Sequence, residues 1–117
     1  MKHYRSLEEV SLQNSWLTIG VFDGVHRGHQ EIIKMLTVGT HAKNIPAVVL
    51  TFDPHPANVL GRAEIGLLTL PDERAELLVS MNVDVVITEH FTKELSAVTA
   101  FDFMSRLTRH LGLKHLL

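Results

Sequence analysis

The stretch WLTIGVFDGVHRGHQEIIKML, residues 16–36, decides the fold of this 117-residue chain. It begins with an apolar run at residues 16–22, which predicts a strand buried on both faces. It continues through three closely spaced glycines and ends in an amphipathic stretch in which Ile32, Ile33 and Leu36 share one helical stripe. A strand, a tight turn and a helix in this order form the first half of a βαβ unit.

The rest of the chain repeats this alternation of short apolar runs and amphipathic stretches. Residues 47–52 and 83–87 predict two more buried strands, and residues 113–117 resemble the opening of a fourth. Parallel crossovers are right-handed in nearly all proteins, so this order predicts an α/β fold with a Rossmann-like parallel sheet and flanking helices. Because the chain stops within the fourth strand, we expect a truncated domain.

Three helices are expected to connect these strands. The first starts near Gly28 and ends by Gly39, and Gly112 would end the third. Paired residues with capping-box spacing precede the second and third helices: Thr69 with Asp72, and Thr99 with Asp102. The side chains expected to pack these two helices on the sheet are Leu77, Leu78, Met81, Phe103, Leu107 and Leu111. Trp16, Phe91, Phe101 and Phe103 are likewise expected to fill the core rather than to stack on a ligand.

The amino-acid composition argues against several classes of partner and site. Eleven Lys and Arg against 13 Asp and Glu leave a formal charge of −2, which argues against nucleic acid as a partner. The absence of cysteine excludes disulfides and thiolate metal sites and fits a reducing compartment. No signal peptide or membrane-length apolar window is found, so we expect a soluble cytoplasmic protein without membrane contact.

The turn after the first strand holds the densest cluster of candidate site residues. Its glycines let the backbone approach a ligand, and the start of the next helix offers free N–H groups to anions. His26 and His29 are three residues apart and would share a helical face, where imidazoles stabilise charge during phosphoryl transfer. The spacing matches neither GxGxxG nor GxxxxGK[ST]. An ordinary tight turn with surface histidines is the structural alternative.

Two motifs resemble the signatures of one family. Residues 18–30, TIGVFDGVHRGHQ, and residues 51–56, TFDPHP, are similar to the first and second signatures of bacterial FAD synthetases, the bifunctional riboflavin kinase/FMN adenylyltransferases. Further similarity lies in residues 68–69, 73–74, 77–78, 83–87, 91 and 101–103. This family belongs to the nucleotidyltransferase superfamily, whose fold agrees with the pattern above.

The resemblance implies transfer of AMP from ATP to FMN, giving FAD and pyrophosphate with Mg²⁺ assisting. It implies His26 and His29 as catalytic contacts to the phosphates. The residues that it implies for ATP binding are Gly20, Phe22, Asp23, Gly24, His26 and His29, and those for FMN binding are Asp53, Pro54, His55 and Pro56. On spacing alone, residues 53–56 are better explained as a rigid strand exit with a solvated histidine.

The chain also departs from the family. The family continues past residue 117 into an asparagine- or aspartate-containing motif and an arginine segment, then a riboflavin kinase domain, none of which is present. We therefore interpret residues 1–117 as an FMN adenylyltransferase domain incomplete at its C-terminus, not forming FAD at a useful rate alone. We also expect self-association through the unfinished strand at residues 113–117.

Three alternatives remain open. The chain could be a noncatalytic nucleotide-binding remnant, or an adenylyltransferase for another phosphorylated acceptor. A zinc site could form from His26, His29 and His55 with Asp23 or Asp53, but the phosphate interpretation already accounts for these positions, so no resident metal is expected. The other histidines are expected to be mostly solvated: His3, His41, His90, His110 and His115.

Overall fold

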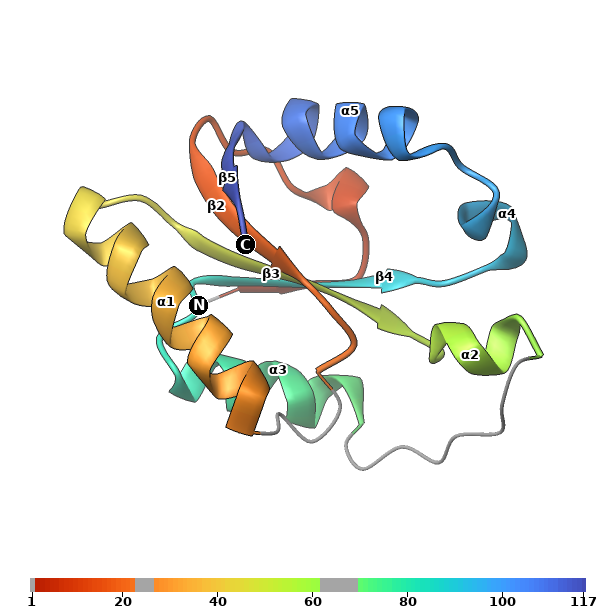
Figure 1. Cartoon of the computed structure of the whole chain (residues 1–117), viewed down its shortest axis with the longest axis horizontal. Helices are drawn as coiled ribbons and strands as arrows, with labels where there is room; N and C mark the ends of the chain where they lie inside the picture. Colours follow the sequence, from red (N-terminus) through yellow and green to blue (C-terminus); the bar gives the residue numbers. More distant parts are fainter. Residues whose placement is uncertain (1, 23–26, 62–69) are drawn as a thin grey trace.

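The computed structural model describes residues 2–22, 27–61 and 70–117, and it contains a five-stranded parallel sheet flanked by helices (Figure 1). The strands are β1 (Lys2–Tyr4), β2 (Ser15–Ile19), β3 (Ala47–Asp53), β4 (Val85–His90) and β5 (Leu113–Leu116). The helices are the short 3₁₀-helix η1 (Leu7–Glu9), α1 (Arg27–Lys43), α2 (Pro56–Val59), α3 (Pro71–Ser80), α4 (Lys93–Ser96) and α5 (Ala100–Leu111). The expected α/β class with a parallel sheet is confirmed.

The strand order is β1-β4-β3-β2-β5. The chain steps from β2 to β3 and then to β4 on one side, and it returns to the other side of β2 to form β5. This reversal creates a topological switch point between β2 and β5, and open α/β sheets bind ligands outside the carboxyl ends of strands at such a point.

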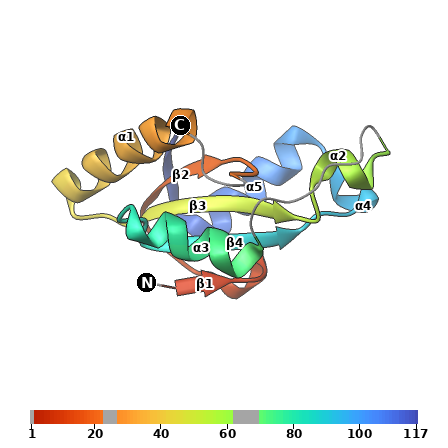
Figure 2. The ribbon, with the colours of Figure 1, turned by 90° about the horizontal axis from the view of Figure 1, so that it is seen from below.

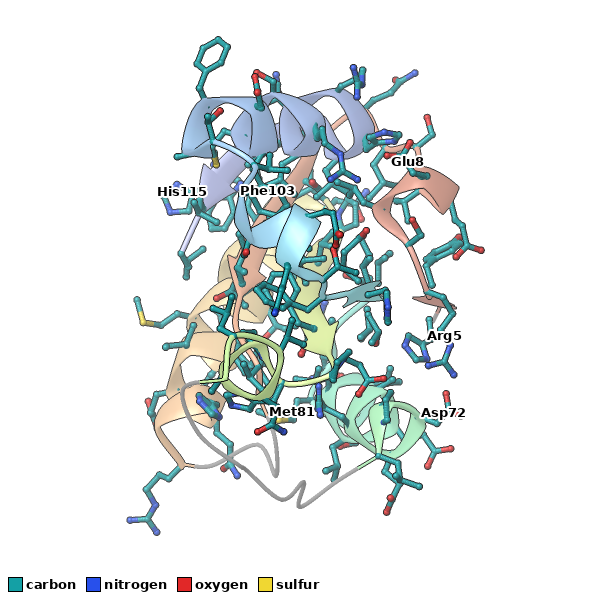
Figure 3. The ribbon with its side chains drawn as sticks, turned by 90° about the vertical axis from the view of Figure 1, so that its right-hand side faces the viewer. Arg5, Glu8, Asp72, Met81, Phe103 and His115 are labelled. Carbon is teal, nitrogen blue, oxygen red and sulfur yellow. The ribbon has the colours of Figure 1, made fainter. Side chains whose placement is uncertain are left out.

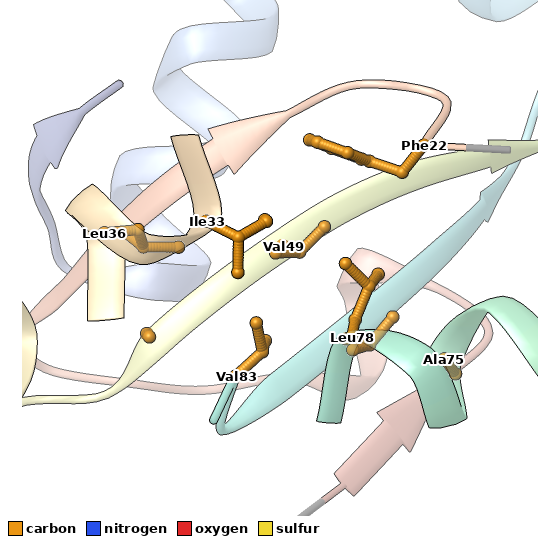
Figure 4. Packing of buried hydrophobic residues seen from close by; sticks show 9 residues of the cluster. Phe22, Ile33, Leu36, Val49, Ala75, Leu78 and Val83 are labelled. Carbon is orange, nitrogen blue, oxygen red and sulfur yellow. The ribbon is translucent and has the colours of Figure 1, made fainter. Parts of the chain in front are cut away.

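Helices cover both faces of the sheet, with α1 and α3 on one face and α5 on the other (Figures 1 and 2). Figure 4 shows the core under α1 and α3, which contains Phe22, Ile33, Leu36, Ala47, Val49, Ala75, Leu78, Val83 and Val86. The second core lies towards η1 and α5 and contains Leu7, Val10, Leu17, Val48, Leu50, Val85, Ile87, Leu107 and Leu111. The central strands are therefore buried on both faces, as their continuous apolar runs predicted.

Helix α1 does not end at Gly39, and this expectation was wrong. Gly39 lies inside the helix, where a Cβ would come within 2.2 Å of a Trp16 ring atom. Close packing on the tryptophan therefore explains this glycine. The helix instead gives way to Asn44, which has a φ of +56° and takes the left-handed position where a helix commonly terminates.

The helix caps were predicted with mixed success. The Thr99 hydroxyl accepts a hydrogen bond from the Asp102 amide at 3.1 Å, and Gly112 follows α5 with a φ of +55°, which confirms both ends of that helix. Thr69 lies outside the described residues. The N-cap of α3 is Leu70, whose amide donates to the Glu73 carboxylate at 3.1 Å.

Three apolar side chains expected in the core are exposed instead: Ile32 at 39%, Leu77 at 41% and Phe101 at 80%. Adjacent residues of a helix point about 100° apart, so the helices that bury Ile33 and Leu78 turn their preceding neighbours outward. Phe101 is two positions before Phe103 and points to the opposite side of α5.

Strand β1 was not predicted, and it makes His3 a structural residue. β1 pairs in parallel with β4, and His3 Nε2 lies 2.7 Å from the Thr88 hydroxyl. Arg5 pairs with Asp72 at the start of α3, next to each other in Figure 3. Burial, followed by the charge of Arg5, lowers the pKa of His3. His3 is therefore not one of the solvated histidines.

A second polar cluster joins η1 to α5. Glu8 pairs with Arg106 at 2.9 Å and with His110 at 3.3 Å, and His110 Nδ1 lies 3.1 Å from the Val10 carbonyl. The hydrogen bond from Arg106 lowers the pKa of Glu8. His110 thus also departs from the expectation of a solvated histidine.

The strand boundaries differ from the sequence prediction. β2 ends at Ile19 rather than residue 22, and β4 covers Val85–His90 rather than residues 83–87. β5 is confirmed; it is an edge strand that pairs only with β2, and its side chains are mostly exposed. Across the described ranges, no helix has both the length and the apolarity needed to cross a membrane.

Candidate functional site

The segments that carry both signature motifs leave the sheet at the same edge. β2 and β3 are parallel neighbours, so residues 20–22 and 54–55 follow their carboxyl ends side by side. Figure 3 faces this edge, with the short helix α2 in front at the centre. β4 ends at the same edge beside β3, which brings a third strand end to the site.

The first turn is shaped by Phe22. This residue has a φ of +56°, a left-handed conformation that costs a non-glycine residue roughly 1–2 kcal/mol. Its ring is only 2% exposed and packs in the core, which compensates for that cost. A Cβ on Gly20 would lie 2.8 Å from the Phe22 ring, so any other residue there would have to displace that buried ring. Phe22 therefore offers a ligand its backbone and not an exposed ring.

His29 lies in the first helical turn of α1, seven residues after Phe22. Its half-buried ring packs edge-on against Phe22, with ring centroids 5.0 Å apart and planes at 68°. Gly28 is exposed, and a Cβ placed on it would meet no atom of the described residues within 4 Å. The start of α1 therefore combines open space with the free backbone N–H groups of a helix N-terminus. The candidates Asp23, Gly24 and His26 lie outside the described residues.

The second motif forms a capped strand exit. A cis peptide bond joins Asp53 to Pro54, and His55 is the N-cap of α2. His55 Nδ1 accepts a hydrogen bond from the Ala57 amide at 3.0 Å, which leaves the proton of a neutral ring on Nε2. Pro56 takes the first helical position, which suits its fixed φ. His55 thus has a capping role that spacing alone did not indicate.

The end of β4 adds a residue that sequence analysis missed. His90 stands level with Asp53 in the sheet register and is exposed, and the Phe91 amide donates to the Asp53 carbonyl at 3.1 Å. The end of this apolar run could have indicated His90, since the same rule had identified the other two segments. The error in the predicted boundary of β4 concealed it.

Two polar residues behind the site, Thr51 and Arg74, lie in segments that resemble the family, but the sequence analysis gave them no role. Arg74 of α3 is fully buried and donates to the Thr51 hydroxyl and to the Phe52 carbonyl. Nothing in the spacing of α3 distinguishes Arg74 from a solvated arginine.

An apolar hollow of about 290 Å³ opens on the α5 side of this edge. It is lined by Phe52, Phe91, Leu95, Val98, Ala100 and Phe103. The Phe52 and Phe91 rings meet edge-on, 5.6 Å apart. A larger and more polar hollow of about 470 Å³, beside His41 and Asp84, lies at the opposite edge, where β3 and β4 begin. The apolar hollow is therefore the one next to the motifs.

The arrangement suits a ligand with two chemically different parts. On the α1 side, a helix start and glycine-lined backbone can hold an anion through N–H groups. On the α5 side, aromatic and aliphatic side chains can hold a flat apolar ring. The two parts lie on opposite faces of the sheet, so the ends of β2 and β3 separate them by the thickness of the sheet.

Comparisons with known proteins agree with these motifs. The family model for FAD synthetase matches residues 8–117. The chain is 32% identical to the bifunctional riboflavin kinase/FMN adenylyltransferase of Listeria monocytogenes, over 98% of this chain and 37% of the relative. It is 34% identical to the corresponding Escherichia coli protein, over 95% of this chain and 36% of the relative. The chain thus spans little more than a third of these relatives.

A solved structure supports the fold alone. The crystal structure of a macrolide-efflux protein from Streptococcus pneumoniae matches with a TM-score of 0.83 and 22% identity, covering 99% of this chain and 40% of that one.

Proposed function

This chain belongs to the FAD synthetase family, and on that premise we propose that its carboxyl edge binds ATP and FMN for adenylyl transfer. The proposal treats residues 1–117 as part of an FMN adenylyltransferase domain. It includes a cytoplasmic location, which the lack of cysteine supports.

One observation carries the proposal. The strand ends that lead to the open start of α1 also border an apolar hollow lined by three phenylalanines. ATP would place its phosphates on the α1 side, and FMN would place its flavin ring in the hollow. The two nucleotides would then meet at the ends of β2 and β3, where the reacting phosphates must come together.

The proposal assigns one set of residues to ATP and another to FMN. For ATP these are Gly20, Phe22, Asp23, Gly24, His26 and His29, of which His26 and His29 contact the phosphates as catalytic groups. For FMN these are Asp53, Pro54, His55 and Pro56, joined by the side chains that line the hollow. Phe22 contributes through its backbone, because its ring is buried.

The reaction follows from these positions. An oxygen of the FMN phosphate attacks the α-phosphorus of ATP and forms a new P–O bond. The bond from the α-phosphorus to the bridging oxygen breaks, and pyrophosphate leaves with that oxygen and the electron pair. ATP enters as its magnesium complex. The protein needs no nucleophile of its own, because in-line positioning and charge stabilisation by N–H groups and imidazoles drive such transfers.

Calorimetric titration of the 117-residue chain tests the two binding sites. We expect Mg-ATP to bind, and we expect FMN to bind more tightly than either riboflavin, which lacks the phosphate, or ribose 5-phosphate, which lacks the ring. Absence of Mg-ATP binding would overturn the proposal. Equal binding of FMN and ribose 5-phosphate would remove the flavin assignment and favour an adenylyltransferase for another phosphorylated acceptor.

A second assay measures whether the 117-residue chain forms FAD on its own. FAD formed from FMN and Mg-ATP is measured by chromatography, with the Escherichia coli relative as the positive control. Binding of both nucleotides with little or no FAD formation is the result expected for an incomplete domain, and turnover comparable to that of the Escherichia coli relative would contradict that expectation.

A further inference from the structure

Arg74 is a large charged side chain that is completely buried, on the inner side of α3. Removing a guanidinium from water is unfavourable unless hydrogen bonds replace its hydration. Arg74 Nη1 donates to the Thr51 hydroxyl at 3.1 Å and to the Phe52 carbonyl at 3.2 Å. Both partners belong to the last residues of β3, directly before the segment that carries the second motif.

The contact continues from β3 to the end of β2. The Thr51 hydroxyl donates its only proton to the Val21 carbonyl, with 2.6 Å between the two oxygens. A hydroxyl oxygen that donates its proton in one direction can accept through its lone pairs in another, so the bond from Arg74 and the bond to Val21 are compatible. Arg74, Thr51 and Val21 therefore form a continuous polar relay from α3 through β3 to the turn.

The relay ends at the peptide group before Phe22, a residue whose backbone and ring are both constrained. The Val21 carbonyl belongs to the peptide group that leads into Phe22, the residue with a positive φ and a buried ring. The Phe22 ring is in turn the surface on which the His29 ring packs. A change in the orientation of the Val21 carbonyl would thus move Phe22 and, with it, His29 at the start of α1.

We propose that Arg74 is a positioning residue that, through Thr51, sets the spacing between the phosphate-binding turn and the end of β3. The inference rests on the proposed function, since it assigns the relay to the ATP side of that site. Arg74 touches neither substrate. It orients the groups that do.

The chain offers a matched control for the relay. Thr51 and Thr88 are register neighbours on β3 and β4, and they are 1% and 4% exposed. The Thr88 hydroxyl contacts His3 and is not part of the relay. Thr51→Val and Thr88→Val therefore make the same chemical change at adjacent, equally buried positions, and only the first one breaks the relay.

The first measurement is the amide nitrogen shift of Phe22 in two-dimensional NMR spectra of the 117-residue chain. This nitrogen shares a peptide group with the Val21 carbonyl and senses loss of its hydrogen bond. We expect Thr51→Val and Arg74→Lys to shift the Phe22 signal, and Thr88→Val and Thr51→Ser to leave it near its wild-type position. Equal displacement by Thr51→Val and Thr88→Val would overturn the relay.

The second measurement is Mg-ATP affinity at a temperature well below unfolding. We expect Thr51→Val and Arg74→Lys to weaken binding about tenfold, as loss of one positioning interaction does. Thr51→Ser and Thr88→Val should stay within about twofold of wild type. A purely structural Arg74 would instead lower the unfolding temperature without changing affinity or the Phe22 signal, and that result would overturn the proposal.

The two measurements separate this inference from the proposed function. If wild-type chain binds no ATP, the proposed function fails, and the Phe22 signal alone decides whether the relay exists. If Thr51→Val does not fold, Arg74→Lys supplies the same test, because lysine keeps the charge but its shorter side chain does not place a donor where Arg74 Nη1 lies.

Discussion

The two faces of the carboxyl edge are built from adjacent residues but held together by different forces. Thr51 faces α3 and takes part in hydrogen bonds to Arg74 and Val21, whereas Phe52 lines the apolar hollow on the α5 side. Because successive strand residues point to opposite faces, β3 supplies polar chemistry to one face and aromatic chemistry to the other. Synthesis of a dinucleotide, as proposed for this site, would need both environments close together.

β4 shows the same alternation with a different result. Thr88 faces His3 on the polar side, and Glu89 on the other side accepts a hydrogen bond from the Leu7 amide at 2.7 Å. Both residues fasten the N-terminal segment to the sheet. β3 therefore contributes side chains to the candidate site on both faces, whereas Thr88 and Glu89 of β4 support the site from behind.

The largest expected effect comes from a substitution in the apolar hollow. Phe91→Ala removes one of the rings that line the hollow and should weaken FMN binding by about five- to 150-fold, since aromatic stacking on a flat ring is worth about 1–3 kcal/mol. Mg-ATP affinity should stay within about twofold. Phe101→Ala is the control, because Phe101 is 80% exposed on α5. Titration with each nucleotide checks this, and an equal loss for both nucleotides would contradict the separation of the faces.

A change at Gly28 tests the polar face. Gly28→Val adds a branched side chain where a Cβ meets no atom of the described parts of the chain within 4 Å, so the free energy of unfolding should change by less than about 1 kcal/mol. The new side chain would occupy the space expected for phosphate, and we expect Mg-ATP affinity to fall about five- to tenfold while FMN affinity is retained. Gly28→Ala should give a smaller loss. Unchanged ATP affinity in a folded Gly28→Val chain would exclude the start of α1 as the phosphate site.

A pH experiment distinguishes the supporting part of the polar face from the site. Burial lowers the pKa of folded His3 below its ordinary value of 6.5, so the unfolded chain takes up this proton first as the pH falls. The contribution of His3 to stability is therefore present above about pH 6.5 and is lost as the pH falls through the folded pKa.

Urea unfolding at pH 7.5 and pH 5.5 measures this contribution. We expect His3→Asn to reduce the difference between the two urea midpoints relative to wild type, and to leave Mg-ATP affinity at pH 7.5 unchanged. The lowered pKa of Glu8 affects stability only at lower pH, because its contribution is lost below about 4.5. An undiminished difference in His3→Asn would assign the pH dependence to other groups.

The smallest expected effect concerns β5, where neither face is well covered. Its side chains are mostly exposed, Leu116 is 43% exposed, and its outer edge has no strand beside it in the described structure. We propose weak self-association at this edge. Trp16, the single tryptophan, packs against His115 of β5 with ring centroids 4.6 Å apart, so its fluorescence should change on dilution. Leu116→Lys should abolish the dilution effect, and a monomer at every concentration by sedimentation would contradict the proposal.

A site residue could be predicted only where the sequence pattern that identifies it lies within a few positions of the residue. Both motifs could be placed because each directly follows an apolar run that had to be a buried strand. The relay could not, since Arg74 is 23 residues from Thr51, and Thr51 is 30 residues from Val21. Nor could the hollow be predicted, because its lining comes from β3, the end of β4, α4 and α5 together. Pairings of this kind depend on the strand register, which local patterns do not specify.

The sequence alone determined the strand and helix at residues 16–36, the parallel α/β class and both caps of α5. These features depend on apolar runs, a threonine hydroxyl and a left-handed glycine, each of which acts on residues only a few positions away. Only the tertiary structure decided that Gly39 continues a helix over Trp16, that Phe101 faces outward and that β1 joins the sheet. His3 and Thr88 are 85 positions apart in the chain, and their hydrogen bond forms only after the strands between them have assembled. Packing and long-range hydrogen bonds override local preference wherever burial supplies more free energy than the local signal.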